Sequence, residues 1–299
     1  MAGERKINTA NDKIRLVTSF GIGINIVLSV SKFVVGFLTG SISLVADGFH
    51  SLSDMVTDVA VLLGIHFGAK EPDSKHPYGH GRVETFTTAF IAVVLIIVGA
   101  EMIRRAAIGI AKGQIVHPSY AVLAVAALSV LSKEVLYRLT RRVAVQTHSS
   151  ALYANAWHHR SDAFSSVAVI IGVGALKYGF KYGDHIAAVT VGLMIILVGS
   201  RILGDCFNEL IERAVDDKTI LQIEGIIKSN GHVRQWHKLR TRVVGREVFI
   251  DLHILVDPAL AITDAHSIAE SLESMMHHQI NRPVNIIVHV EPDIPGLRK

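Results

Sequence analysis

The stretch DGFHSLSD, residues 47–54, lies inside a long apolar run, and the interpretation of the whole chain starts from it. At about 3.6 residues per turn, His50 and Asp54 fall one turn apart on the same face of a helix. Charged groups at membrane depth are costly, so they normally face a partner, a cavity or an ion. We therefore expect this pair to line a functional site within a membrane-spanning helix.

A second stretch, WHHRSD at residues 157–162, repeats the same spacing in another apolar segment. Its pair is His158 and Asp162, although His159 and Asp162 are also compatible with one helix face. The four-residue spacing of the first pair favours His158 over His159. Two imidazoles and two carboxylates converging from two helices would form a tetrahedral nitrogen and oxygen site, which suits zinc.

Three more polar residues lie close to these motifs along the sequence. We assign Asp47 and Asp58 to helix packing or to the ion pathway, because Asp47 lies a turn or more from Asp54 in one direction and Asp58 lies a turn from it in the other. Asn155 falls one turn before His159 and could line the same cavity.

The composition indicates a membrane protein: of 299 residues, 50% are hydrophobic and only 19% are charged. The apolar residues form blocks that are long enough to cross a bilayer, and these blocks fill the first two-thirds of the chain. We expect a domain of six transmembrane helices over residues 13–206. The predicted spans are approximately 14–38, 43–67, 83–103, 120–139, 152–176 and 184–203.

The distribution of basic residues predicts the orientation of these spans. An even number of spans places both termini on one side, and the lysines and arginines of the connections favour the cytoplasm. Residues 1–12 are polar and lack a cleavable signal sequence, so we expect a cytoplasmic tail on a multi-pass protein of the cell (inner) membrane. The small net charge of +4 reflects this topology, and nucleic acid is not an expected partner.

After a linker at 207–216, residues 217–299 have the composition of a soluble domain. Periodicity predicts helices at 218–230 and 263–279, and β-branched or alternating residues predict strands at 239–244, 248–256 and 284–290. The order α-β-β-α-β is typical of a small α+β domain. Gly231 and either Thr263 or Asp264 are the expected helix caps.

Two further groups of residues have the composition of metal ligands. The loop between the second and third spans carries Asp73, His76 and His80, with proline and glycine bending the backbone between them. The soluble domain carries a group distributed over its strands and one helix: His237, His253, His266, His289 and Glu291. Several histidines together favour a second metal cluster there over isolated, solvated side chains. The lone Cys206 excludes a thiolate cluster within one chain, and the absence of a His-Glu-x-x-His string argues against an intramembrane metalloprotease.

Taken together, the paired intramembrane motifs, the loop DSKHPYGHGR at residues 73–82 and the C-terminal domain resemble the cation diffusion facilitator family over nearly the full chain. The resemblance implies a homodimer that exports a divalent metal in exchange for protons by alternating access, and not an enzyme. It also implies a metallochaperone-like, regulatory cytoplasmic domain whose metal cluster lies at the dimer interface. The implied transport ligands are His50, Asp54, His158 and Asp162.

The ligand types bear on the choice of metal. Histidine with aspartate favours Zn²⁺, with Cd²⁺ or Co²⁺ as further substrates, whereas family members that handle Mn²⁺ tend to replace the histidines. Iron and manganese stay alternatives, iron because iron carriers of magnetosomes resemble other stretches of the chain. A non-transporting scaffold partner of a related transporter is a different class of function. Metal needs neutral imidazole and ionised carboxylate, so we expect His50 or His158 to carry the exchanged proton.

Overall fold

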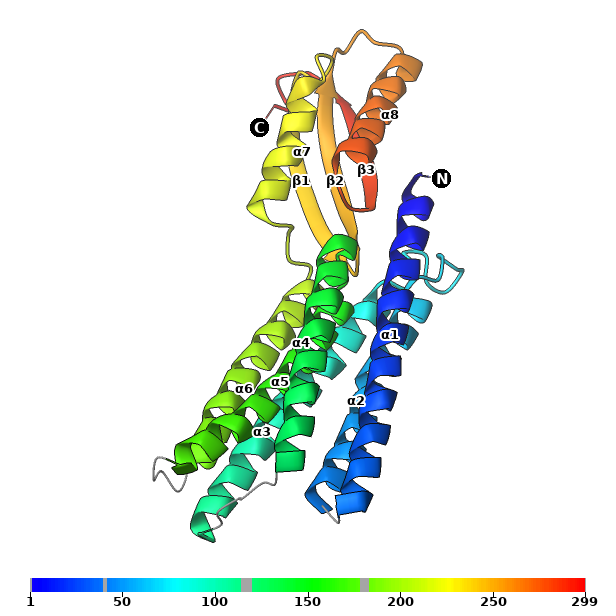
Figure 1. Ribbon diagram of the computed structural model, residues 1–299. Helices are drawn as coiled ribbons and strands as arrows, with labels where there is room; N and C mark the ends of the chain where they lie inside the picture. The colour runs from blue at the N-terminus through cyan, green and yellow to red at the C-terminus, as the bar shows by residue number, and fades with distance from the viewer. Residues whose placement is uncertain (1, 40–41, 114–119, 178–182, 299) are drawn as a thin grey trace. The chain divides into compact units, whose positions relative to one another are not determined.

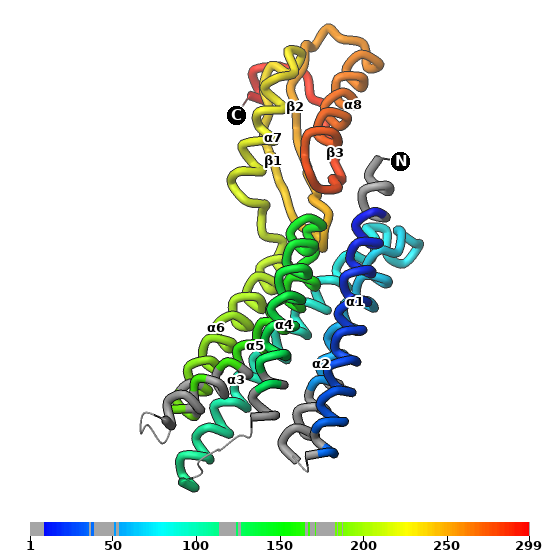
Figure 2. Tube along the Cα trace, viewed as in Figure 1, coloured from blue at the N-terminus to red at the C-terminus, as the bar shows by residue number. Residues whose placement is uncertain are grey.

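The computed structural model describes residues 2–39, 42–113, 120–177 and 183–298, whose backbone is drawn as a ribbon in Figure 1 and can be followed along the Cα trace in Figure 2. Some side chains within these helices, His50 and Asp47 among them, lie outside the described part. The chain divides into two compact units, Asn11–Cys206 and Phe207–Lys299, and the second also includes Met1–Ala10.

The described residues of the first unit form six long helices, which confirms the predicted fold class. Figure 1 shows how these helices are arranged. Large apolar side chains such as Leu38, Phe86 and Leu197 point outward, as they do when lipid is the solvent. Three stretches among the described residues combine the length and apolar composition of a bilayer crossing: Thr9–Val35, Arg82–Ala111 and Ala188–Leu210. The helices are α1 (Ala2–Thr39), α2 (Ile42–Gly68), α3 (Arg82–Ala111), α4 (Tyr120–Thr147), α5 (Ser150–Lys177) and α6 (Gly183–Leu210).

Small residues allow α3 and α6 to approach closely. A Cβ atom added to Gly99 would lie 2.7 Å from the carbonyl oxygen of Gly192, and one added to Gly192 would lie 2.8 Å from that of Gly99. Glycine at such positions lets helix backbones touch inside a membrane, where van der Waals packing replaces the hydrophobic effect.

A tight turn places α4 beside α5, the helix with the second histidine and aspartate pair. The turn has His148 at φ 53°, and the amide of Ser149 donates to the carbonyl of Ala144 at 3.1 Å. Helix α4 therefore extends to Thr147, eight residues beyond its predicted end, and α5 begins directly after it at Ser150. The two antiparallel helices then bring α4 side chains against the functional face of α5.

The second unit has the predicted α-β-β-α-β order (Figure 1). Its sheet order is β1-β2-β3, with β1 and β2 antiparallel and β2 and β3 parallel. The predicted helix caps were wrong in detail: the C-cap of α7 is Asn230 and not Gly231, and the N-cap of α8 is Ala261, without a side-chain cap, and not Thr263 or Asp264. The elements are α7 (Asp217–Ser229), β1 (Gln235–Val244), β2 (Glu247–Val256), α8 (Ile262–Gln279) and β3 (Val284–Pro292).

Side chains along β2 point alternately to the two faces of the sheet, which separates the core residues from the candidate metal ligands. Ile250, Leu252 and Ile254 are buried in one apolar cluster with residues of α7 and α8. Because successive side chains of a strand point to opposite faces, Asp251 and His253 lie on the other face of the sheet. His253 therefore lies on the face of the sheet that points away from this core.

Candidate metal-binding sites

The buried site in the first unit consists of Asp54 from α2 with His158 and Asp162 from α5. The Nε2 atom of His158 lies 3.7 Å from Oδ1 of Asp54 and 4.0 Å from Oδ2 of Asp162. All three residues are buried, and their ligand atoms lie within 4.8 Å of one another. The structure thus brings together three of the four predicted ligands. The side chain of the fourth, His50, lies outside the described residues.

Lysine 133 from α4 enters the same buried site. Its Nζ atom donates to Oδ2 of Asp54 at 3.0 Å and to Oδ2 of Asp162 at 2.9 Å, and the residue is only 2% exposed. Lys133 thus connects α4 to both α2 and α5 through the two carboxylates. Lys133 was not among the site residues predicted from the sequence. One feature of the sequence could have identified it: Lys133 lies inside an apolar segment, and a lysine at membrane depth needs a partner.

A separate buried network contains Asp58 and His159. The carboxylate of Asp58 accepts hydrogen bonds from Asn155 at 2.6 Å and from Asn25 of α1 at 3.0 Å, and Nε2 of His159 lies 3.5 Å from its Oδ1. All four residues are almost completely buried. His159 is therefore directed at Asp58, and His158 is the α5 histidine that faces Asp54 and Asp162. The network ties α1, α2 and α5 together beside the site.

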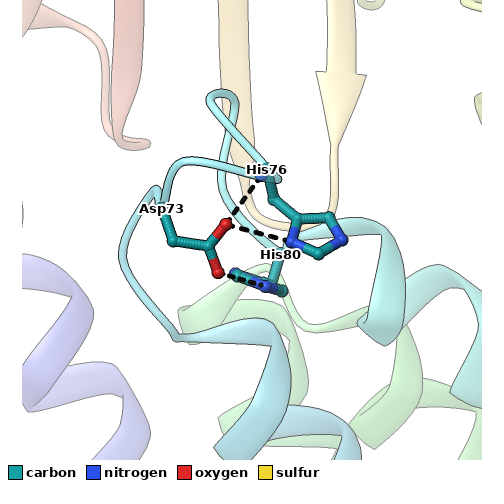
Figure 3. Close-up of side chains that lie close together, drawn as sticks. All are labelled: Asp73, His76 and His80. Atoms are coloured by element: carbon teal, nitrogen blue, oxygen red, sulfur yellow. Dashed lines mark hydrogen bonds and ion pairs between the residues drawn. The ribbon is translucent and has the colours of Figure 1, made fainter.

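The loop between α2 and α3 forms the second cluster by itself (Figure 3). Oδ1 of Asp73 accepts from the backbone amide of His76 at 2.7 Å and lies 3.1 Å from its Nδ1, while Oδ2 lies 3.5 Å from Nε2 of His80. Gly79, at φ 78°, turns the chain between the two histidines. The amides of His76 and Lys75 hold the pKa of Asp73 below its ordinary value. Asp73 and His76 are about half exposed.

The third cluster lies across the three strands of the second unit. His237, His253 and His289 are in register on β1, β2 and β3, and an irregularity in β1 follows His237 at Lys238, which has φ 51°. The carboxylate of Glu291 lies 3.1 Å from Nε2 of His237 and 2.8 Å from Nδ1 of His253. The hydrogen bond from His253, with the charge of the neighbouring histidines, lowers the pKa of Glu291.

Two of the predicted cytoplasmic ligands are placed differently from the rest. His289 lies 3.5 Å from the carboxylate of Glu291, but its side chain is 61% exposed. His266 on α8 contacts Glu270 at 3.4 Å, is 72% exposed, and is not among the three residues whose ligand atoms converge. Within the described chain, His237, His253 and Glu291 are therefore the compact core of this cluster.

The donor atoms in all three clusters fit a zinc ion. Each cluster combines imidazole nitrogen with carboxylate oxygen, and each holds at least three such atoms within 4.8 Å. Zinc accepts this mixture in tetrahedral geometry without a ligand-field cost. The clusters differ mainly in burial: one is enclosed by helices, one is an exposed loop and one lies on an open sheet face.

Comparison with known proteins assigns both units. Residues 19–211 match the cation efflux transmembrane domain, and residues 215–293 match the cytoplasmic domain of cation efflux proteins. The magnetosome protein MamB of Magnetospira sp. (strain QH-2) is 32% identical over 270 residues, covering 90% of this chain and 92% of MamB. The manganese efflux system protein MneP of Bacillus subtilis (strain 168) is 29% identical over 299 residues, covering 98% of this chain and 99% of MneP.

A third relative matches with similar identity and coverage. The uncharacterized transporter MJ0449 of Methanocaldococcus jannaschii is 33% identical over 267 residues, covering 89% of this chain and 94% of MJ0449. The matches to both domains, and the coverage of whole relatives, extend over nearly all of the sequence. The chain is therefore an integral membrane protein that belongs to the cation diffusion facilitator family of divalent-metal efflux transporters.

Proposed function

We propose that this protein exports Zn²⁺ from the cytoplasm in exchange for protons, by alternating access. The observation that carries the proposal is the convergence of Asp54, His158 and Asp162 from two helices at a buried point within the membrane unit. Ionisable residues at such depth mark ion pathways. With His50 one turn from Asp54 on α2, the donor set is two imidazoles and two carboxylates.

The charge of this donor set suits a dication. Two ionised carboxylates and two neutral imidazoles carry a formal charge of −2, which a divalent ion cancels. A neutral assembly is the least costly one to bury in a bilayer. Imidazole nitrogen favours zinc over Mn²⁺ and Mg²⁺, which prefer oxygen ligands.

Proton exchange follows from the same ligands. An imidazole must lose its proton to bind metal, and a carboxylate must be ionised, so protonation and metal occupancy exclude each other. A proton on His158 or His50 on one side of the membrane thus promotes metal release there. Protons that flow into the cytoplasm down their gradient then drive the export of Zn²⁺.

The cytoplasmic unit is proposed to sense zinc and to join two copies of the chain in a homodimer, with both termini in the cytoplasm. The cluster of His237, His253 and Glu291 lies on the open face of the sheet, where a second copy can add ligands. His266 and His289, which are exposed in one chain, are the candidates for such shared coordination. Metal bound across two chains would stabilise the dimer.

Flux into proteoliposomes tests the proposal directly. The purified full-length chain should accumulate Zn²⁺ in vesicles with an acidic interior, and should do so much more slowly without the pH gradient. Equal flux with and without the gradient would contradict antiport, and no flux of any dication would indicate a non-transporting scaffold. Competition by Mn²⁺ belongs in the same experiment, because MneP is similar over its whole length.

A further inference from the structure

We propose that Lys133 is a tethered competitor of the transported dication: its ammonium and the metal bind the same two carboxylates in turn. The inference rests on the proposed transport site and adds a residue from a third helix to it. Lys133 would then set how tightly the site holds its ion and would assist release.

The geometry makes the two cations mutually exclusive. The Nζ atom of Lys133 is within 3.0 Å of Oδ2 of both Asp54 and Asp162. A zinc ion coordinated by these two oxygens would lie about 2.0–2.2 Å from each. Both positions fall in the same small space between the carboxylates. Metal binding through these oxygens therefore requires Lys133 to withdraw.

The charges at the site also favour occupation by either Lys133 or the dication, but not by both. Asp54 and Asp162 are 3% and 7% exposed, and two ionised carboxylates at that depth need a counter-cation. Lys133 supplies one positive charge to the pair, and a dication supplies two. Leaving both cations in place would give the pair a net positive charge in a medium of low dielectric constant, which is strongly unfavourable.

Alternate occupation of the carboxylates by Lys133 and the metal would help a transporter to release its ion. A site that binds its ion must also let it go, and tight ligands alone would retain the ion. When Lys133 re-forms its two hydrogen bonds, it takes over the carboxylates that the ion leaves, so the vacated charges are not left unpaired. The lysine thus lowers the affinity for metal and accelerates dissociation.

The competing explanation is that Lys133 only cross-links α2, α4 and α5. That explanation predicts the opposite result on removal of the charge. Without the cross-link the two carboxylates would separate, and the site would bind metal less well. The sign of the change in affinity therefore separates the two roles.

Zinc titration of the full-length protein in detergent provides the test. The background carries His76→Ala, His80→Ala, His237→Ala and His253→Ala, so that the intramembrane site dominates binding. In this background we expect Lys133→Met to lower the Zn²⁺ dissociation constant by about tenfold or more, and to slow Zn²⁺ release to a chelator. Lys133→Arg, which keeps the charge, is the matched control and should show neither change.

Unchanged or weaker zinc binding in folded Lys133→Met would overturn the inference, as would equal tightening in Lys133→Arg. If the methionine variant does not fold, Lys133→Gln removes the charge but keeps amide donors, and the same criterion applies to it. Absence of intramembrane zinc binding in the parent background would instead refute the proposed transport site, and the inference with it.

Discussion

The buried cluster of α2 and α5 and the loop cluster use the same residue types in opposite environments. Asp54, His158 and Asp162 are at most 7% exposed and come from two helices. Asp73 and His76 are more than half exposed and lie within one short loop. The loop cluster organises itself with a backbone amide, whereas the buried cluster contains a lysine from a third helix.

This difference in burial has consequences for how each cluster would bind a metal ion. Exposed charges are screened by water and salt, so we expect the loop to hold a metal ion more weakly than the buried cluster does. Buried charges must always be compensated, by Lys133 or by the ion. The buried cluster therefore suits obligatory transport, and the loop cluster suits capture or sensing near the membrane surface.

The largest effect is expected from removal of one buried carboxylate. Asp162→Ala should reduce zinc flux into proteoliposomes by about a hundredfold or more, because a ligand is lost and Lys133 binds Asp54 alone. Glu101→Gln is the control, since Glu101 pairs only with exposed Arg104 and Arg105 among the contacts described for it. Flux above half of the unmodified protein in Asp162→Ala would remove this residue from the pathway.

A second large effect concerns stability and not transport chemistry. Asp58→Ala should lower the free energy of unfolding by about 3 kcal/mol, because the amides of Asn25 and Asn155 lose their buried acceptor. Thermal unfolding in detergent measures the change, and zinc affinity measured on the folded fraction should alter far less. A variant of unchanged stability that binds no intramembrane zinc would assign Asp58 to the ion pathway instead.

Substitutions in the cluster on the three strands of the second unit should have an intermediate effect on flux, seen only at low zinc concentration. His237→Ala combined with His253→Ala removes two of the three convergent ligands and should abolish activation of flux by low concentrations of zinc. Flux at saturating zinc should stay within about twofold of the unmodified protein, because the transport ligands are intact. Complete loss of transport by the folded double variant would show that this cluster carries the ion and does not sense it.

The smallest effect is expected in the loop. The pKa of Asp73 is lowered by the amides of His76 and Lys75, so its contribution to loop order is complete above the ordinary pKa. That contribution is lost as the pH falls through the lowered pKa. The protection factor of the His76 amide against hydrogen exchange, corrected for the intrinsic exchange rate at each pH, should fall in that acidic range, and Asp73→Asn should remove this dependence on pH. Equal pH dependence in both proteins would show that another group orders the loop.

Residues close in sequence could be assigned to their clusters before the structure. Helical spacing places His158 and Asp162 on one face, and the loop joins Asp73 to His76 within one turn. The α-β-β-α-β order also followed from periodicity, because each element has a distinct apolar repeat. These features could be predicted because each depends on residues that are close together in the sequence.

The parts that the sequence could not supply depend on contacts between distant elements. Lys133 reaches Asp54 across 79 positions of sequence, and its role requires knowing that α4 packs against α5. His159 lies 3.5 Å from Asp58 whereas His158 faces Asp54, and spacing along α5 alone does not reveal this division. The exposure of His266 depends on where α8 lies on the sheet, which spacing does not reveal.

The most direct test is X-ray absorption spectroscopy of zinc bound to full-length protein that lacks the loop and sheet histidines. We predict four nitrogen or oxygen neighbours at about 2.0–2.1 Å with an imidazole scattering signature, which Asp54→Ala and Asp162→Ala should each abolish. A zinc spectrum that is unchanged when both aspartates are replaced would contradict the account.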